Sequence, residues 1–516
     1  MARFAFLYLF PFTVDNTIKE VVFTRGAVNA YKNVKLTGDL QNDIRLFKNI
    51  FSGDSVFKCR EINSGGTGFA VMFLDGMVNN AIISEAVVKP LALMRGGNGA
   101  AVNARYISQS VIFGSEVSYK TDVADMISTV LCGDTLVLIS GSKTALGVNT
   151  KGFCTRSVEE PADERVTQGP REGFIENAMY NLSLIRRKLL TPDLKVKPVK
   201  LGRRSDTSVY VCYLDSLVDK SILDTLYARL EKIDIDGVLD SNYLTEYIRD
   251  SKTSIFKTVG TTERPDVVAA RILEGRVAVI VDGTPMVLTL PYLFSENFQS
   301  DEDYYLSYIV SSVRRLLRYI CFVASVSVPA VFIALCTFHI ELLPTRFAIS
   351  VAMLRSGVPI SSVGECLLLV IVFEVLKEAG VRMSQSLGHA LSIVGGLVVG
   401  QAAVEARIIS APMLIAVAFS GICGLMVPRL KTSVLYIRVI SVIVCSLSGL
   451  YGFMALGAVV VIHVLNLKSF GVDYTVSLSR IGAPSLKDTL FRAPWPKMLY
   501  RPLFNKNLRR TGGKRS

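Results

Sequence analysis

The chain has 516 residues, half of them hydrophobic, and a formal net charge of +13. That length allows two or three domains, and the long apolar runs after about Arg318 exclude a purely soluble protein. Much of the positive charge lies from Lys468 to Ser516, where 11 Lys or Arg and 2 Asp give +9. A basic tail behind a membrane domain favours anionic membrane lipid as a partner, and we expect no nucleic acid.

The first part of the chain contains an internal repeat. Val71–Ile83 resembles Val211–Leu223, and Cys132–Gly141 parallels Glu274–Gly283 at nearly the same offset along the chain. Two matched segments in the same order predict two related α/β subdomains. Each is expected to contain a strand, an Asp-bearing turn and a helix, then a helix, a glycine, a strand and a turn.

A linker is predicted between the subdomains, at residues 157–170, because this stretch is acidic and contains Pro161 and Gly169. After it, apolar residues recur at helical spacing from Phe174 to Leu189. Basic residues close this predicted helix at Arg186–Lys188, where they suit the negative end of the helix dipole.

The second part of the chain predicts up to six membrane crossings. Arg318–Ile340 is the clearest, because the 22 mainly apolar residues after Arg318 cross a ~30 Å hydrocarbon core at about 1.5 Å each. The others are 364–376, 389–404, 408–427 and two halves of 434–465, which Gly449 and Gly452 are expected to split as a hairpin. Six crossings place both ends on one side, and the positive-inside rule makes that side cytoplasmic.

Glu374, Glu378 and Arg382 are the candidate pore or gating residues, since their spacing puts them on one helix face. Charges at membrane depth cost about 3 kcal/mol each, so they need partners or water. Two interpretations stay open: a polar lining of an ion or solute path, and an interfacial helix with intrahelical pairs. Candidate close-packing positions between helices are Gly395, Gly396 and Gly400.

Enzyme motifs are absent from the sequence: it has no P-loop, no HExxH, no GxSxG elbow and no paired Cys/His ligands. With three His and no metal spacing, we expect no catalytic residues, no cofactor and no metal.

Several strings resemble the A subunits of GerA-type spore germinant receptors. These are Gln168–Asn177, Asn181–Arg187, Thr262–Asp266, Glu274–Pro285, Glu302–Tyr305, Phe373–Arg382, Gly400–Val404 and Lys468–Gly471. They keep their order over roughly residues 40 to 495. The chain departs from the pattern at Met383–Ser384, where relatives usually have an apolar residue and a proline, and in its first 35 residues.

The resemblance implies a multi-pass protein of the inner membrane of the endospore. It also implies a second membrane subunit and a lipoprotein subunit as partners, and a homo-oligomeric, nutrient-gated ion channel that triggers germination. A paralogous accessory protein of the SpoVAF kind shares the architecture, so a non-conducting membrane scaffold is the main alternative. A secondary transporter is the other alternative, but its internal repeats would lie in the membrane part.

The sequence therefore predicts two related soluble α/β subdomains followed by a multi-pass transmembrane helical bundle. The predicted segments are an N-terminal segment (1–35), subdomain 1 (36–156), a linker (157–170), subdomain 2 (171–310), a helical domain of four to six spans (311–467) and a basic cytoplasmic tail (468–516). A charge network between the subdomains is predicted from Arg171, Glu172, Glu263, Arg264 and Asp266.

Overall fold

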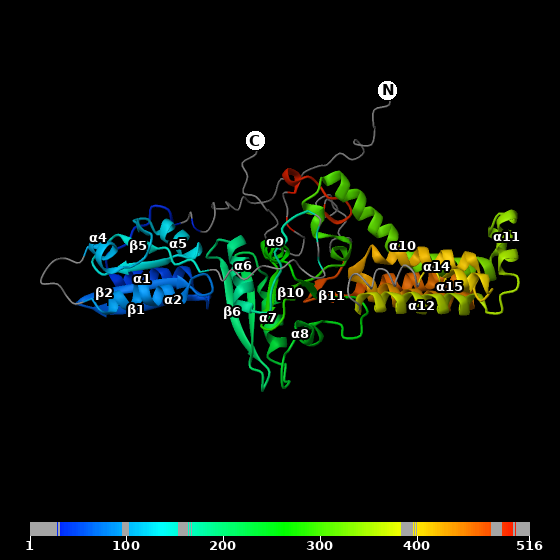
Figure 1. The fold of residues 1–516 in the computed structure, drawn as a ribbon, viewed down its shortest axis with the longest axis horizontal. Helices are drawn as coiled ribbons and strands as arrows, with labels where there is room; N and C mark the ends of the chain where they lie inside the picture. The colour runs from blue at the N-terminus through cyan, green and yellow to red at the C-terminus, as the bar shows by residue number, and fades with distance from the viewer. Residues whose placement is uncertain are drawn as a thin grey trace, which may run out of the picture.

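The computed structural model describes residues 28, 31–94, 103–152, 164, 166, 168–382, 396, 398, 400–475, 488–498 and 501, with the backbone alone at 381 and 382. Two α/β units are followed by a helical domain, and the three lie side by side along the longest axis of the molecule (Figure 1). The predicted N-terminal segment, linker and basic tail fall mainly outside the described residues.

The first α/β unit is a five-stranded antiparallel sheet between two helical layers. Its strand order is β1-β2-β4-β5-β3. The strands are β1 (Phe57–Ser64), β2 (Thr67–Leu74), β3 (Val117–Lys120), β4 (Thr135–Ile139) and β5 (Ala145–Val148). One face packs on α1 (Leu40–Ile50) and α5 (Val123–Leu131). The other face packs on α2 (Asn80–Ile82), η2 (Ile83–Val88), α3 (Lys89–Ala92), α4 (Ala104–Tyr106) and η3 (Ile107–Val111).

The second α/β unit repeats this arrangement, with the strand order β6-β7-β9-β10-β8. Its strands are β6 (Leu194–Leu201), β7 (Thr207–Leu214), β8 (Gly260–Thr262), β9 (Val277–Val281) and β10 (Val287–Leu290). Helices α7 (Lys220–Leu230) and α8 (Ser241–Ile248) cover one face. The other face is covered by α6 (Ala178–Lys188), which lies inside the predicted helix, and α9 (Pro265–Leu273).

The repeat predicted from the sequence is confirmed strand by strand. The matched segments form β2 and β7 and then β4 and β9, and these strands hold the same places in the two sheets. Equivalent residues also cap the helices that follow β2 and β7. The side-chain oxygens of Asn79 and Asp219 each accept a hydrogen bond of 3.0 Å from the amide two residues on.

The two α/β units meet where the loop before β1 touches α6 and β6. Arg186 and Asp54 form an ion pair of 2.5 Å that is almost fully buried. Beside it, the Ser55 amide donates to the Val196 carbonyl at 3.1 Å and the Lys195 ammonium donates to the Ile50 carbonyl at 3.4 Å. Paired charges and backbone bonds therefore fix the relative position of the two units.

The helical domain consists of α10 (Tyr308–Thr337), α11 (Thr345–Arg355), α12 (Ser362–Arg382), α14 (Ala411–Leu425) and α15 (Lys431–Asn466), with a short helix at 400–405. Among the described residues, two helical stretches are long and apolar enough to cross a membrane, Tyr308–Thr337 and Pro428–Asn466. Much of their apolar surface is exposed, as at Val323, Leu447 and Val461. Helix α11 lies at the end of the domain far from the sheets (Figure 1).

Helix α15 reverses direction at Gly449, as the sequence predicted. This glycine has φ 62° and ψ −144°, a conformation that interrupts the helix. Val434 and Val464 lie in one apolar cluster near the sheets, although a straight helix would separate them by about 45 Å. The hairpin therefore starts and ends beside the second α/β unit.

Candidate functional site

The segment that leaves the second sheet and enters the helices is the most strongly charged buried part of the described chain. After β10 the chain forms two short 3-10 turns, η4 (Phe294–Phe298) and η5 (Asp301–Tyr304), and then begins α10. Ser300 and Asp303 form a reciprocal capping box at η5. This junction places three carboxylates, those of Glu296, Asp301 and Asp303, between the sheet and the helices.

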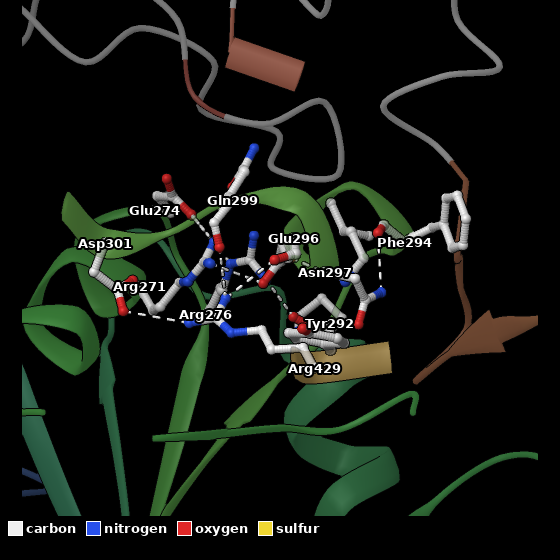
Figure 2. Close-up of polar contacts among 12 residues, drawn as sticks. Arg271, Glu274, Arg276, Tyr292, Phe294, Glu296, Asn297, Gln299, Asp301 and Arg429 are labelled. Atoms are coloured by element: carbon white, nitrogen blue, oxygen red, sulfur yellow. Dashed lines mark hydrogen bonds and ion pairs between the residues drawn. The ribbon is translucent and has the colours of Figure 1, made fainter. Parts of the chain in front are cut away.

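Glu296 is the centre of the first cluster (Figure 2). One of its oxygens accepts from Arg276 at 2.5 Å, and the other lies 3.0 Å from a nitrogen of Arg271. Arg276 also contacts Glu274 at 3.1 Å, and both Arg276 and Glu296 are almost fully buried. The end of α9 and the start of β9 are therefore bound to the junction by charge-assisted hydrogen bonds.

Arg429 connects this cluster to the helical domain. It lies just before α15 and donates to the carbonyl oxygens of Glu296 at 3.0 Å and Gln299 at 3.2 Å. Its guanidinium is also 3.3 Å from a carboxylate oxygen of Asp301 and 3.5 Å from one of Glu164. Figure 2 shows Arg429 pointing into the junction beside Glu296 and Asp301. Movement of the α15 hairpin must therefore displace the junction.

Burial shifts the proton affinity of groups around Arg429. It raises the pKa of the Glu164 carboxyl, although Arg429 acts in the opposite direction. It raises the pKa of the Tyr292 hydroxyl to about 12, and lowers the pKa of the Lys257 ammonium. The junction is thus shielded from water, which strengthens the attraction between its charges.

A second cluster holds the first turns of α10. Asp303 is fully buried and accepts hydrogen bonds of 2.9 Å from Arg315 and from Arg318. Arg315 also contacts a carboxylate oxygen of Asp488 at 3.0 Å, and the Tyr304 hydroxyl donates to Asp488 at 3.1 Å. α10 begins well before the predicted span, because these arginines pair with acids inside the protein.

The residues predicted to join the two subdomains have other neighbours. Arg264 is fully buried and forms two hydrogen bonds with Asp266, at 2.7 and 3.1 Å. The Tyr305 hydroxyl donates to Asp266 at 2.5 Å, which ties the start of α9 to the segment before α10. Glu263 donates its amide to Glu164 at 3.2 Å.

A charge network between the subdomains therefore stays a prediction, because the hydrogen bonds between Arg264, Asp266 and Tyr305 lie at the junction. Glu172 pairs within its own unit, with Lys188 at 3.1 Å and Arg187 at 3.6 Å, and Arg171 precedes it on the exposed surface. Pro265 starts α9 next to the junction, so Arg264 and Asp266 face the junction. The contact between the subdomains uses Asp54 and Arg186.

Helix α12 carries the predicted pore or gating residues. Glu374 is partly buried, and both its oxygens accept from Lys377, at 2.9 and 3.1 Å. Glu378 lies one turn further along and is exposed, and Arg382 ends the helix. The three residues lie on one helix, as expected. Their role in conduction stays a prediction.

A close helix contact is seen at a glycine of α14, while packing at Gly395, Gly396 and Gly400 stays a prediction. Gly395 lies outside the described residues. A Cβ added at Gly396 would meet no described atom within 4 Å, and at Gly400 it would meet Leu414 at an ordinary 3.6 Å. A Cβ at Gly421 would lie 2.6 Å from the Phe373 ring, so α12 and α14 approach each other closely there.

The buried junction was not predicted from the sequence, which indicated no contact among Arg271, Arg276, Glu296 and Arg429. A usable signal existed: an acidic run from Glu296 to Asp303 precedes the basic run from Arg314 to Arg318. Such blocks of opposite charge at a domain boundary indicate pairing. Among the described residues no group of three His, Cys, Asp or Glu could hold a metal ion.

Comparison with known proteins gives matches along most of the chain. The profile of the family described as Bacillus/Clostridium GerA spore germination protein matches residues 45–504. Spore germination protein KA of Bacillus subtilis (strain 168) is 37% identical over 467 residues, which cover 90% of this chain and 86% of that protein. The uncharacterized membrane protein YfkQ of the same strain is 37% identical over 451 residues, 87% of each chain.

A solved structure also matches the α/β part. It is the crystal structure of the N-terminal domain of the A subunit of the Bacillus megaterium spore germinant receptor GerK3, which is 30% identical. The match covers 50% of this chain and 97% of that chain, with a TM-score of 0.40.

Proposed function

Since the chain belongs to the GerA family of spore germination proteins, we propose that it is the A-type membrane subunit of a nutrient-sensing germinant receptor. In this proposal the α/β units relay the nutrient signal to the helices, and the helices open an ion path. The observation that carries the proposal is the junction, where Arg271, Glu296 and Arg429 join the second sheet to the α15 hairpin.

We place the helical domain across a membrane as a multi-pass bundle. The contacts at the two ends of each helix indicate whether the chain runs toward the sheets or away from them. α10 starts at the junction and ends at Thr337, and His339 just after it lies beside the Gly449 bend of the hairpin. The hairpin returns to the second α/β unit, where His463 hydrogen-bonds to Ser254 at 3.0 Å. These three helical segments run the full length of the domain.

Helices α12 and α14 are the next crossings. The fully buried Glu365, in the first turn of α12, accepts from the Ser410 amide at the start of α14. α14 then ends near Val427, which packs with Phe256 of the second α/β unit. We propose one further crossing between α12 and α14, where residues 400–405 are helical. Six crossings would leave both ends on the side of the sheets.

The inner membrane of the endospore is the location that we infer, with the α/β units and the basic tail on the cytoplasmic side. Basic side chains gather at the end of the bundle nearest the sheets, and they include Arg314, Arg429 and Lys431. This distribution is what the positive-inside rule requires. The proposed partners are a second membrane subunit, a lipoprotein subunit and further copies of this chain.

The proposed ion path lies between copies of the chain. Glu374 is partly buried and pairs with Lys377, and Glu378 lies one turn further along the same helix with its side chain exposed. Because Glu378 lies on the surface of this chain, water or another subunit can reach it, as a charge at membrane depth requires. Glu378 is therefore the better candidate to line or gate a cation path.

A non-conducting scaffold is the second candidate, because the same junction would hold partner subunits in place without transmitting a signal. The variant Arg429→Gln separates the two functions. It removes the contacts with Asp301 and Glu164 but leaves the outer surface of the bundle intact. A relay predicts slower nutrient-triggered ion release at normal protein level and normal subunit assembly. A scaffold predicts that release falls only in proportion to lost assembly.

A further inference from the structure

Arg438 of α15 holds a buried positive charge between α10 and α14. Its side chain is 2% exposed. It donates to two neutral acceptors, the carbonyl oxygen of Ser325 at 2.9 Å and that of Ser420 at 3.2 Å. No carboxylate of the described residues lies within ion-pair distance of its guanidinium. A buried charge with only neutral hydrogen-bond partners keeps a desolvation cost, which a nearby anion would lower.

A hollow between α12, α14 and α15 opens beside this guanidinium. It is lined by Arg438, Lys431, Lys377 and Glu374, with Phe373 and Leu435 as apolar walls. Glu374 is the one acid of this lining, and both of its oxygens are bound by Lys377. Lys431 is exposed and forms no ion pair with any described residue. The lining therefore has an excess of two positive charges, on Lys431 and Arg438.

Two glycines of α14 make room for this arrangement. A Cβ added at Gly424 would lie 3.1 Å from a terminal nitrogen of Arg438, and one at Gly421 would clash with the Phe373 ring. Larger residues at these positions would push the guanidinium and the ring away from the hollow. The fold therefore provides space for a cation side chain where ordinary helix packing would exclude it.

The hollow lies at the end of the bundle nearest the sheets. Lys431 is the first residue of α15, directly after Leu430, which packs against the second α/β unit in the same cluster as Phe256. In the proposed membrane placement this is the level of the lipid headgroups. Phosphate oxygens accept from Arg and Lys donors together, and acyl chains suit the apolar walls.

We propose that this hollow binds a phosphate-class anion, supplied by the headgroup of an anionic phospholipid, between Lys431 and Arg438. One phosphate oxygen enters the hollow, while the rest of the headgroup stays at its mouth. The lipid source rests on the membrane placement proposed above, whereas the phosphate chemistry does not. Bound lipid would then fix the relative position of α12, α14 and the hairpin.

The test uses the full-length chain purified in a neutral detergent, with thermal unfolding as the readout. The probes are dioctanoyl phosphatidylglycerol, inorganic phosphate, and dioctanoylglycerol, which has the acyl chains without a phosphate. We expect a saturable rise in Tm with phosphatidylglycerol. Lys431→Gln should need at least about fivefold more lipid, the factor for one cation near an anionic surface. Arg438→Gln should lose the response.

Lys468→Gln is the matched control, because Lys468 is an exposed lysine at the same end of the bundle. It should respond like the unmodified chain. If inorganic phosphate also gives a saturable rise in Tm that depends on Lys431, the binding site is supported and its ligand is free phosphate. An equal rise with dioctanoylglycerol, or an unchanged response in Lys431→Gln, would overturn the proposal even if Arg438→Gln failed to fold.

Discussion

Asp54 and Arg186 lie far apart in the chain and form a buried ion pair between the two repeats. The pair joins the loop before the first sheet to the helix that follows the linker. Two further nitrogens of Arg186 are buried without a hydrogen-bond partner, so Asp54 supplies most of the compensation for this charge. The carboxylate of Asp54 is therefore central to the contact between the two units.

Replacing Asp54 with Asn should destabilise the chain strongly. Removing one partner of a buried pair leaves an uncompensated charge, at a cost of about 3–5 kcal/mol in the free energy of unfolding. Thermal or urea unfolding of the purified chain measures this cost. Glu61→Gln serves as the control, because its pair with Lys48 is about half exposed and should contribute under ~1 kcal/mol. Equal effects of the two substitutions would contradict a structural role for the buried pair.

Arg429 and Asp301 should be energetically coupled. A double-mutant cycle with Arg429→Gln and Asp301→Asn is expected to give a coupling energy of about 1 kcal/mol, since both side chains are largely buried at the junction. Unfolding of the four purified chains provides the measurement. The exposed pair of Arg203 and Asp234 is the comparison cycle and should give a smaller value. A coupling energy of zero at the junction would show that the contact transmits nothing.

Glu164 should make stability depend on pH. Burial raises the pKa of its carboxyl in the folded chain above the ordinary value of about 4.3. Between these two pKa values the folded chain holds more protons than the unfolded chain, so the free energy of unfolding falls as pH rises. Glu164→Gln removes the group and should flatten this part of the stability curve. An unchanged slope in a pH series of thermal unfolding would be evidence against the burial effect.

Gly449 should tolerate no side chain. Its φ of 62° is unfavourable for other residues, and a Cβ there would lie 2.7 Å from the His339 ring. Gly449→Ala is expected to cost about 1–3 kcal/mol and to lower Tm in detergent. Gly457→Ala in the same helix meets no atom within 4 Å and should be neutral or slightly stabilising. If both substitutions behave alike, the hairpin does not depend on the bend.

Patterns of apolar residues and glycines predicted the elements but not the contacts between them. The constant offset between the two repeats located β2 and β7, because buried strands repeat their apolar runs. Gly449 located the hairpin because a chain reversal inside an apolar stretch needs a special backbone conformation. Spacing along the sequence cannot indicate which distant charges meet. Asp54 and Arg186 were therefore missed, and so was the contact of Arg264 with Asp266 beside Tyr305.

The surface of the bundle was also beyond prediction from the sequence alone. The helical spacing of Glu374 and Glu378 placed both on one helix. It could not reveal that Lys377 neutralises the first glutamate while the second is exposed. That difference depends on how α14 and α15 pack against α12, which single-sequence patterns do not encode.

The central claim is that the helices of this chain open an ion path, and Glu378→Gln in spores of the native host tests it most directly. Monovalent cation release after nutrient addition is measured, with protein level and subunit assembly checked by blot. Glu405→Gln is the control, because Glu405 is an exposed glutamate of the same domain that hydrogen-bonds to Gln401. The account predicts slower or less selective release in Glu378→Gln alone, at normal assembly. Normal release in both variants would contradict it.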